Sequence, residues 1–166
     1  KIQGVSPLPL QIDSSDPVAV EAAVRVYSGK PIINSVNGKQ ESLDAVLPIA
    51  KHYGCAVVGL ALDEQGIPPT AEGRFAVAQR IVEEADKYGI PRSDIFIDCL
   101  VMAASTNQAE VVEILRAITM VKERLGVRTV LGVSNVSFGL PLREIVNATF
   151  LAAAFSAGLD MPILNP

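Results

Sequence analysis

One pattern constrains the fold of this chain more than any other: short apolar runs alternate strictly with longer amphipathic segments. The apolar runs occupy residues 9–12, 31–33, 56–62, 95–97, 129–133 and 161–164. Near-continuous apolar strands separated by helices are typical of a parallel sheet that is covered by helices. The pattern therefore predicts an α/β fold with six parallel strands and five intervening helices.

The expected helices carry recognisable start signals. Asp16, followed by Pro17, is expected to cap the first helix, and Thr70 and Thr106 are expected to cap the third and fourth helices. The second helix is expected over about 42–53, where Pro48 predicts a kink. The last helix is expected over about 142–156, before a glycine.

Almost every expected strand ends in a polar residue. These strand-end residues are Asp13, Asn34, Asp63, Asp98, Asn135 and Asn165. An open, doubly wound sheet usually gathers its ligand residues at one switch point, and no Gly-rich nucleotide loop follows any strand here. A ring of polar residues at the carboxyl ends of the strands is typical of a (β/α)8 barrel.

Such a barrel has eight strands in about 250 residues, whereas this chain has 166 residues and six expected strands. We therefore predict a partial barrel, with two strands and at least one helix outside the chain. The chain also lacks an initiator Met. Both features lead us to expect a piece of a longer polypeptide. Alone, this piece would be unstable or would associate through its edge strands, and a homodimer is therefore one possible state.

The polar strand ends limit the chemistry that the chain can perform. His52 is the only histidine and lies in an expected helix, so no Ser-His-Asp or Cys-His set can form, and no lysine at a strand end offers a Schiff base. Carboxylates and carboxamides suit a flat heterocycle with ring donors and acceptors. Each polar residue could also be only a helix cap or turn former, and Asp63 with Glu64 could simply order its loop.

Composition excludes several other classes. The net charge is −4 without any basic run, which argues against a nucleic-acid partner. The longest strongly apolar stretch, 150–155, is far too short to span a bilayer. Cys55 and Cys99 lie in apolar runs, which suits a reducing, cytoplasmic location, and without a Cys/His cluster no metal site is expected.

Several segments in the order of the chain resemble one known family. They are 12–15 (IDSS), 33–36 (INSV), 61–68 (ALDEQGIP), 96–100 (FIDCL), 131–137 (LGVSNVS) and the tail 150–166. Together they are similar to the pterin-binding methyltransferase domain of cobalamin-dependent methionine synthase and to methyltetrahydrofolate:corrinoid/iron-sulfur protein methyltransferase. The segments LDEQGIP and LGVSNVS are the specific parts of the resemblance.

The resemblance implies a (β/α)8 barrel of the dihydropteroate-synthase-like type that lacks its first two strands and final helix, with 1–166 as a single truncated domain. It implies methyl transfer from methyltetrahydrofolate to a cobalt(I) corrinoid on another domain or protein. Asp13, Asn34 and Asp98 match pterin-ring binders, Gly132 and Ser134 match residues that line the pterin, and Asn135 matches the residue that hydrogen-bonds the methyl-bearing nitrogen.

Three positions depart from the family pattern. Cys99 stands where relatives often carry Pro or Ala, and we expect it to alter the floor of the site. Asn37 replaces a more usual Ser, and Phe138 replaces a Gln of some relatives. Two alternatives remain: a dihydropteroate-synthase-like enzyme, although the expected Gly-rich and basic segments are missing, and a pterin-binding fragment without turnover.

Overall fold

A computed structural model describes residues 2–164 of the chain, and within this range the strands form one parallel sheet. The sheet runs in chain order, and each neighbouring pair is parallel. Its strands are β1 (Gln11–Asp13), β2 (Ile32–Asn37), β3 (Ala56–Leu60), β4 (Ile95–Asp98), β5 (Arg128–Gly132) and β6 (Met161–Ile163). The predicted α/β alternation is confirmed.

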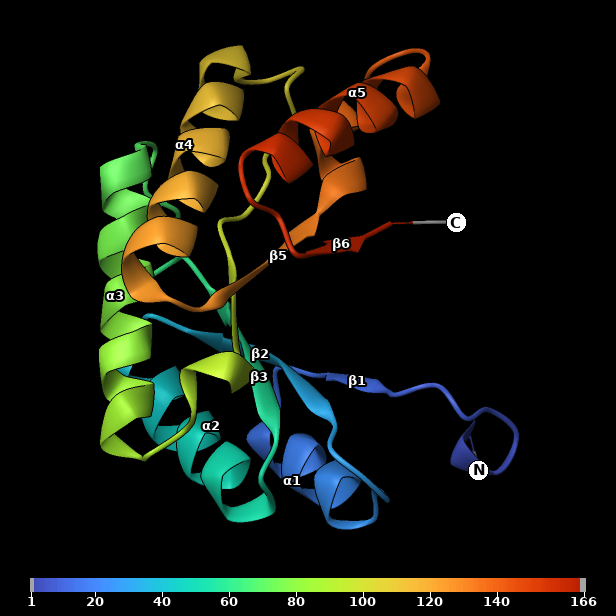
Figure 1. Cartoon of the computed structure of the whole chain (residues 1–166), viewed down its shortest axis with the longest axis vertical. Helices are drawn as coiled ribbons and strands as arrows, with labels where there is room; N and C mark the ends of the chain where they lie inside the picture. The colour runs from blue at the N-terminus through green and yellow to red at the C-terminus, as the bar shows by residue number, and fades with distance from the viewer. Residues whose placement is uncertain (1, 165–166) are drawn as a thin grey trace.

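Helices follow the strands and cover one face of the sheet. They are α1 (Pro17–Arg25), α2 (Gln40–Tyr53), α3 (Ala71–Lys87), α4 (Gln108–Leu125) and α5 (Arg143–Ser156), with short 3-10 helices η1 (Ile2–Gly4), η2 (Arg92–Asp94) and η3 (Val133–Ser137). Figure 1 shows the helices as an arc around the curved sheet, with β1 and β6 at its open side. The described chain is therefore a half-barrel rather than a flat, doubly wound sheet.

Two of the three predicted helix caps are confirmed. The Asp16 carboxylate accepts a hydrogen bond from the Val18 amide at 2.9 Å, and the Thr70 hydroxyl accepts one from the Gly73 amide at 3.2 Å. The prediction for Thr106 is wrong, because Asn107 occupies the N-cap position of α4. The Thr106 hydroxyl instead donates to the Ala103 carbonyl oxygen at 2.8 Å and closes the turn that precedes the helix.

The second helix begins two residues before its expected start. The Ser42 hydroxyl accepts a hydrogen bond from the Asn37 amide at 3.1 Å, and the Asn37 side chain accepts one from the Lys39 amide at 2.9 Å. These bonds order the turn into α2, so the helix begins at Gln40. Pro48 lies inside α2, and the helix continues past it to Tyr53.

Strand β2 runs past Asn34, its expected last residue, and ends at Asn37. Its register with β3 shifts between Asn34 and Val36, which marks a bulge. Ile33 and Val36 both pack in the helix-covered core. An extra residue between them is what brings both to that face, because alternate residues of a regular strand point to opposite faces.

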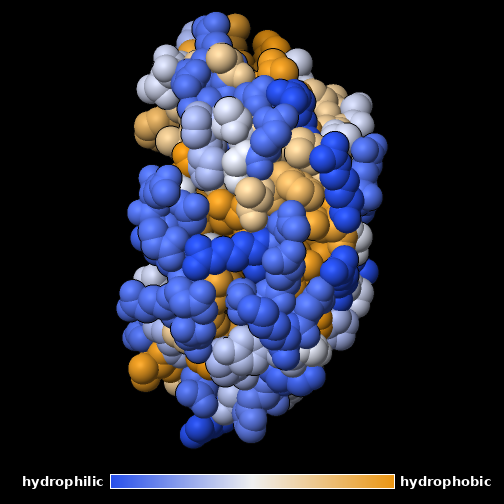
Figure 2. Space-filling model, turned by 90° about the vertical axis from the view of Figure 1, so that its left-hand side faces the viewer, coloured by the Kyte–Doolittle hydropathy of each residue, from blue (hydrophilic) through white to orange (hydrophobic). Residues whose placement is uncertain are grey.

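The sheet has a different apolar core on each face. Val57, Ile97 and Leu131 belong to the large core that also contains buried residues of α2, α3 and α4. Val58, Phe96 and Val130 alternate with them and form a small separate cluster on the inner, concave face. The outer surface of the helices is mostly polar, with apolar atoms in the seams between them (Figure 2). Among residues 2–164, no helix combines the length and apolarity needed to cross a membrane.

Gly59 allows α3 to pack closely against β3. A Cβ at this position would lie 2.9 Å from Ile81 Cγ2 and 3.1 Å from Ile97 Cδ1. We expect Gly59→Ala to lower the free energy of unfolding by about 1–3 kcal/mol, the usual cost of overpacking a core, as measured by chemical denaturation. Gly4→Ala is the control, because no heavy atom lies within 4 Å of its added Cβ. Equal unfolding midpoints for both variants would contradict the packing described here.

Candidate functional site

The alternation of the strands places four of the predicted site residues on the inner face, at the carboxyl end of the sheet. Asp13 and Asn34 follow Ile12 and Ile33, which contact the helix-covered core. Asp98 lies two residues after Phe96, and Gly132 lies two residues after Val130, both in the inner cluster. Because a two-residue step returns a strand to the same face, all four positions face the concave side.

The register of the strands staggers these positions along the sheet. Asp13 pairs with Asn34, and Asn34 pairs with Val58. Asp98 pairs with Leu60, two residues further along β3, and Gly132 lies two residues beyond Val130, the partner of Asp98 on β5. There is no offset between Asp13 and Asn34, whereas each later step along the sheet shifts the position by two residues, and such a shift accompanies the strand tilt that closes a barrel. The four positions therefore follow one rim rather than one straight row of the sheet.

Asp13 and Asn34 line one polar cavity. Its volume is about 380 Å³, and its walls come from the ends of β1 and β2 and from the first turns of α1 and α2. Ser14, Ser35 and Lys39 add further polar groups to the wall. The volume falls in the lower part of the range of small-molecule sites, about 300–1,000 Å³. The cavity can thus hold a compact, polar, ring-sized ligand.

Asp98 is a buried carboxyl at the end of β4, only 8 % exposed. The Leu100 amide donates a hydrogen bond to its Oδ1 at 2.7 Å. Burial raises the pKa of Asp98 to about 6, while the Leu100 amide and the positive charge of Arg74 lower it in part. At neutral pH the side chain is therefore mostly ionised and can accept hydrogen bonds from a ligand.

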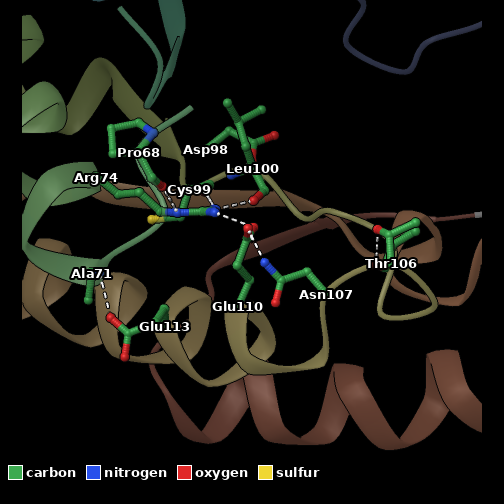
Figure 3. A network of polar contacts seen from close by, with 11 residues as sticks. Pro68, Ala71, Arg74, Asp98, Cys99, Leu100, Thr106, Asn107, Glu110 and Glu113 are labelled. Atoms are coloured by element: carbon green, nitrogen blue, oxygen red, sulfur yellow. Dashed lines mark hydrogen bonds and ion pairs between the residues drawn. The ribbon is translucent and has the colours of Figure 1, made fainter. Parts of the chain in front are cut away.

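A buried arginine forms hydrogen bonds with the backbone just beyond Asp98. Arg74 of α3 is fully buried, and its Nη1 donates to the carbonyl oxygens of Cys99 and Leu100 (Figure 3). Its Nη2 pairs with Glu110 of α4 at 3.1 Å. Sequence reasoning missed Arg74, although a signal was present: four residues before Ala78, it falls on the apolar stripe of its helix.

The loop after β5 carries the remaining predicted residues. Asn135 is exposed in η3, and a Cβ added to Gly132 would lie 3.0 Å from its Nδ2. The absence of a side chain at Gly132 therefore lets the Asn135 amide lie close to the end of β5. Ser134 lines a second hollow, of about 590 Å³, together with Arg143 and residues of α5.

The structure thus brings only part of the predicted set together. Asp13 and Asn34 share one cavity and Ser134 lines another, while Asp98 and Asn135 are not among the residues that line these two hollows. Asp98 and Asn135 nevertheless lie at the same end of the parallel sheet. Asp98 ends β4, and Asn135 lies in η3, which directly follows β5.

Other predicted residues have different surroundings. Asp63 forms a tight turn with Gly66, and its Oδ1 accepts a hydrogen bond from the Gln65 amide at 2.8 Å, which fits the loop-ordering role. Asn165 lies outside the described residues. The expectation that Cys99 shapes the floor of the site is wrong, because its side chain packs in the helix-covered core, on the face opposite to Asp98.

Two further expectations concern thiols and metals. Cys55 and Cys99 are both buried free thiols, and burial raises the pKa of each. Within residues 2–164, no three His, Cys, Asp or Glu side chains are grouped as metal ligands would be.

Burial of the Asp98 charge has a cost that depends on pH. Its folded-state pKa of about 6 exceeds the ordinary value of 3.8, so the protonated form favours the folded state, and stability is lost as the pH rises through 6. We expect Asp98→Asn to raise the free energy of unfolding by about 2–3 kcal/mol above pH 7, because a shift of one unit corresponds to about 1.4 kcal/mol. Below pH 4 the difference should vanish.

Denaturation of both forms across pH 3–8 measures this difference. The control is Asp44→Asn, which replaces an exposed carboxylate of α2 and should cause no comparable change in the free energy of unfolding. A constant difference between Asp98→Asn and the wild type at every pH would contradict the burial argument.

Comparisons with known proteins agree with the geometry. Residues 1–165 match the family described as "Pterin binding enzyme". The chain is 35% identical to methionine synthase of Mycobacterium leprae, over 99% of this chain and 15% of that protein. It is 31% identical to methylcorrinoid:tetrahydrofolate methyltransferase of Eubacterium limosum, over 99% of this chain and 62% of that protein. The chain therefore spans less than two thirds of each of these relatives.

Solved structures share the fold. Dihydropteroate synthase of Xanthomonas albilineans in complex with 7,8-dihydropteroate superposes with a TM-score of 0.74 at 22% identity, over 97% of this chain and 62% of that one. The dihydropteroate synthase of Coxiella burnetii in complex with pteroic acid gives 0.73 at 19% identity, over 97% and 64%. These likenesses confirm a partial (β/α)8 barrel. The match over residues 1–165 shows that the chain belongs to the family of pterin-binding enzymes.

Proposed function

We propose that this chain binds methyltetrahydrofolate and takes part in the transfer of its methyl group to a cobalt(I) corrinoid held by another domain or protein. The observation that carries the proposal is the identity of 31–35% to methionine synthase and to the corrinoid methyltransferase, along nearly the whole chain. The dihydropteroate synthases, at 22% identity or less, share its fold. The two buried free thiols suit the reducing cytoplasm.

In this proposal the inner rim binds the pterin ring. An ionised carboxylate accepts two parallel hydrogen bonds from an aminopyrimidinone edge, and a carboxamide offers a donor beside an acceptor. Asp13 and Asn34 fit these roles because they line one polar cavity. Asp98 fits because its buried carboxyl is mostly ionised at neutral pH. Gly132, at the end of β5, and Ser134, in η3 directly after it, would border the ring.

Asn135 has the catalytic role in this proposal. The pterin nitrogen that carries the methyl group is a poor leaving group, and it must gain a proton or a strong hydrogen bond as the methyl group departs. The Asn135 carbonyl oxygen can accept a hydrogen bond from the protonated nitrogen, and this bond strengthens as charge develops. The proton comes from solvent or from an ordered water.

The methyl acceptor is supplied from outside this chain. The cobalt(I) corrinoid supplies the nucleophile when bound, so no nucleophilic side chain is needed at the rim. Asn135 is exposed, which leaves room for a second domain or protein to reach the nitrogen that Asn135 would contact.

The role of Asn135 predicts a large effect on rate. In the gene product that contains this chain, we expect Asn135→Ala to lower the saturated rate of methyl transfer to cob(I)alamin by about 100-fold or more, as for other groups whose hydrogen bonds strengthen in the transition state. Gln79→Ala removes an exposed carboxamide from α3 and should leave the rate unchanged. A rate for Asn135→Ala within about twofold of the wild type would remove Asn135 from the mechanism.

The role of Asp98 predicts an effect on binding instead. Asp98→Asn keeps the shape of the side chain and the bond from the Leu100 amide, but one ligand donor loses its acceptor. We expect the dissociation constant of methyltetrahydrofolate, measured by calorimetry, to rise by about tenfold or more, while the saturated rate falls far less. Unchanged affinity would show that Asp98 does not contact the pterin.

Dihydropteroate synthesis is the second candidate. What favours it is the fold that this chain shares with dihydropteroate synthase, with a TM-score of 0.74. The same preparation should be assayed for methyl transfer and for condensation of a pterin pyrophosphate with 4-aminobenzoate. We expect only methyl transfer. Condensation alone would replace the proposal, and tight pterin binding with neither activity would identify a binding module.

A further inference from the structure

A fully buried guanidinium is unusual, and its partners show what it holds. The side chain of Arg74 is 0 % exposed and donates to backbone oxygens on two sides. Nε binds the Pro68 carbonyl at 2.8 Å, and Nη1 binds the carbonyls of Cys99 and Leu100. The carboxylate of Glu110 balances the charge (Figure 3). Arg74 therefore joins α3, α4 and the turn after β4.

The backbone that Arg74 binds is the backbone that orients Asp98. Leu100 accepts from Arg74 through its carbonyl oxygen and donates from its amide to Asp98 Oδ1 at 2.7 Å. Its φ of 61° lies in the left-handed region, which a leucine adopts only when its surroundings enforce it. The hydrogen bonds on both sides of Leu100 enforce this turn.

We propose that Arg74 is a positioning residue for pterin recognition, which fixes the turn at Cys99 and Leu100 so that the Asp98 carboxylate is held at the rim. This inference rests on the proposed function of Asp98. Arg74 acts through the backbone of the turn after β4 and has no contact with the ligand. A lysine could not replace it fully, because a single ammonium group lacks the planar fork that spans several oxygens.

The same arrangement places a positive charge near Asp98. The charged and titratable groups near this carboxyl are Arg74 from α3 and the Cys99 thiol, which follows Asp98 in the chain but lies on the other face, with Glu110 of α4 behind Arg74. The positive charge favours ionised Asp98, and Glu110 partly cancels that charge. Removing Arg74 and removing the charge of Glu110 should therefore shift the titration of Asp98 in opposite directions.

The test uses the gene product that contains this chain and two measurements. The first follows the ¹³C carboxyl resonance of Asp98 against pH without ligand. The second measures the dissociation constant of methyltetrahydrofolate across the same pH range. The variants are Arg74→Met, Arg74→Lys and Glu110→Gln. Arg116→Met is the matched control, because Arg116 of α4 also forms an ion pair with α3, through Glu72, but does not contact the turn after β4.

We expect Arg74→Met to raise the midpoint of the Asp98 titration by about 0.5 pH unit or more and to weaken binding by about tenfold. Glu110→Gln should lower the midpoint. Arg74→Lys should restore the midpoint but not the full affinity, and Arg116→Met should change neither. Shifts of opposite sign show that both charges act on Asp98, and weaker binding by Arg74→Lys at a restored midpoint separates the positioning of the turn from the effect of charge.

Other outcomes overturn the proposal. An unchanged midpoint with equally weaker binding at every pH would make Arg74 a merely structural residue, and unchanged affinity would deny the positioning role. If Arg74→Met does not fold, the Glu110→Gln variant decides: an Asp98 titration midpoint that is unchanged or higher in this variant would also overturn the proposal. If the wild type binds no methyltetrahydrofolate, the proposed function fails, whereas the titration still decides whether Arg74 acts on Asp98.

Discussion

The pleat of a parallel sheet that is covered on one face by helices determines where polar groups can lie in this molecule. Val57, Ile97 and Leu131 must face the helices, so their neighbours along each strand must face the concave side. Near the amino ends these neighbours are apolar and form the small cluster around Phe96. Towards the carboxyl ends they are carboxylates, carboxamides and a glycine, and parallel pairing brings all of these ends to one rim.

Much of this arrangement could be predicted from the sequence, because period and capping are local properties. The strand order, the helices and the caps Asp16 and Thr70 follow from them. The extension of β2 could not be predicted, because the bulge exists only against its partner strand. Thr106 and Asn107 both suit a helix start, and the bond from the Thr106 hydroxyl to the Ala103 carbonyl keeps Thr106 in the preceding turn. The burial of Arg74 could not be predicted, because the groups that balance its charge are distant in sequence.

The site and the stability of the protein make opposite demands on Asp98. A carboxyl that is 8 % exposed is disfavoured in its ionised form, and burial accordingly raises its pKa to about 6. Within residues 2–164 no cation forms a direct ion pair with Asp98; the carboxyl has instead an amide donor and a nearby guanidinium. A group held in this way is poorly hydrated before a ligand arrives, so less water must be displaced on binding.

The bulge in β2 also limits how the length of this chain can change during evolution. Loops that connect strands and helices can gain or lose residues at small cost, since closure entropy varies slowly with length. Ser35 is the extra residue of β2, so its removal would restore regular alternation and leave Val36 facing the helices and Asn37 facing the concave side. A regular strand that kept Ser35 would instead turn Val36 towards the concave face and Asn37 towards the helices, which places an apolar side chain at the rim and a carboxamide in the core. The extra residue and the bulge therefore have to be gained or lost together.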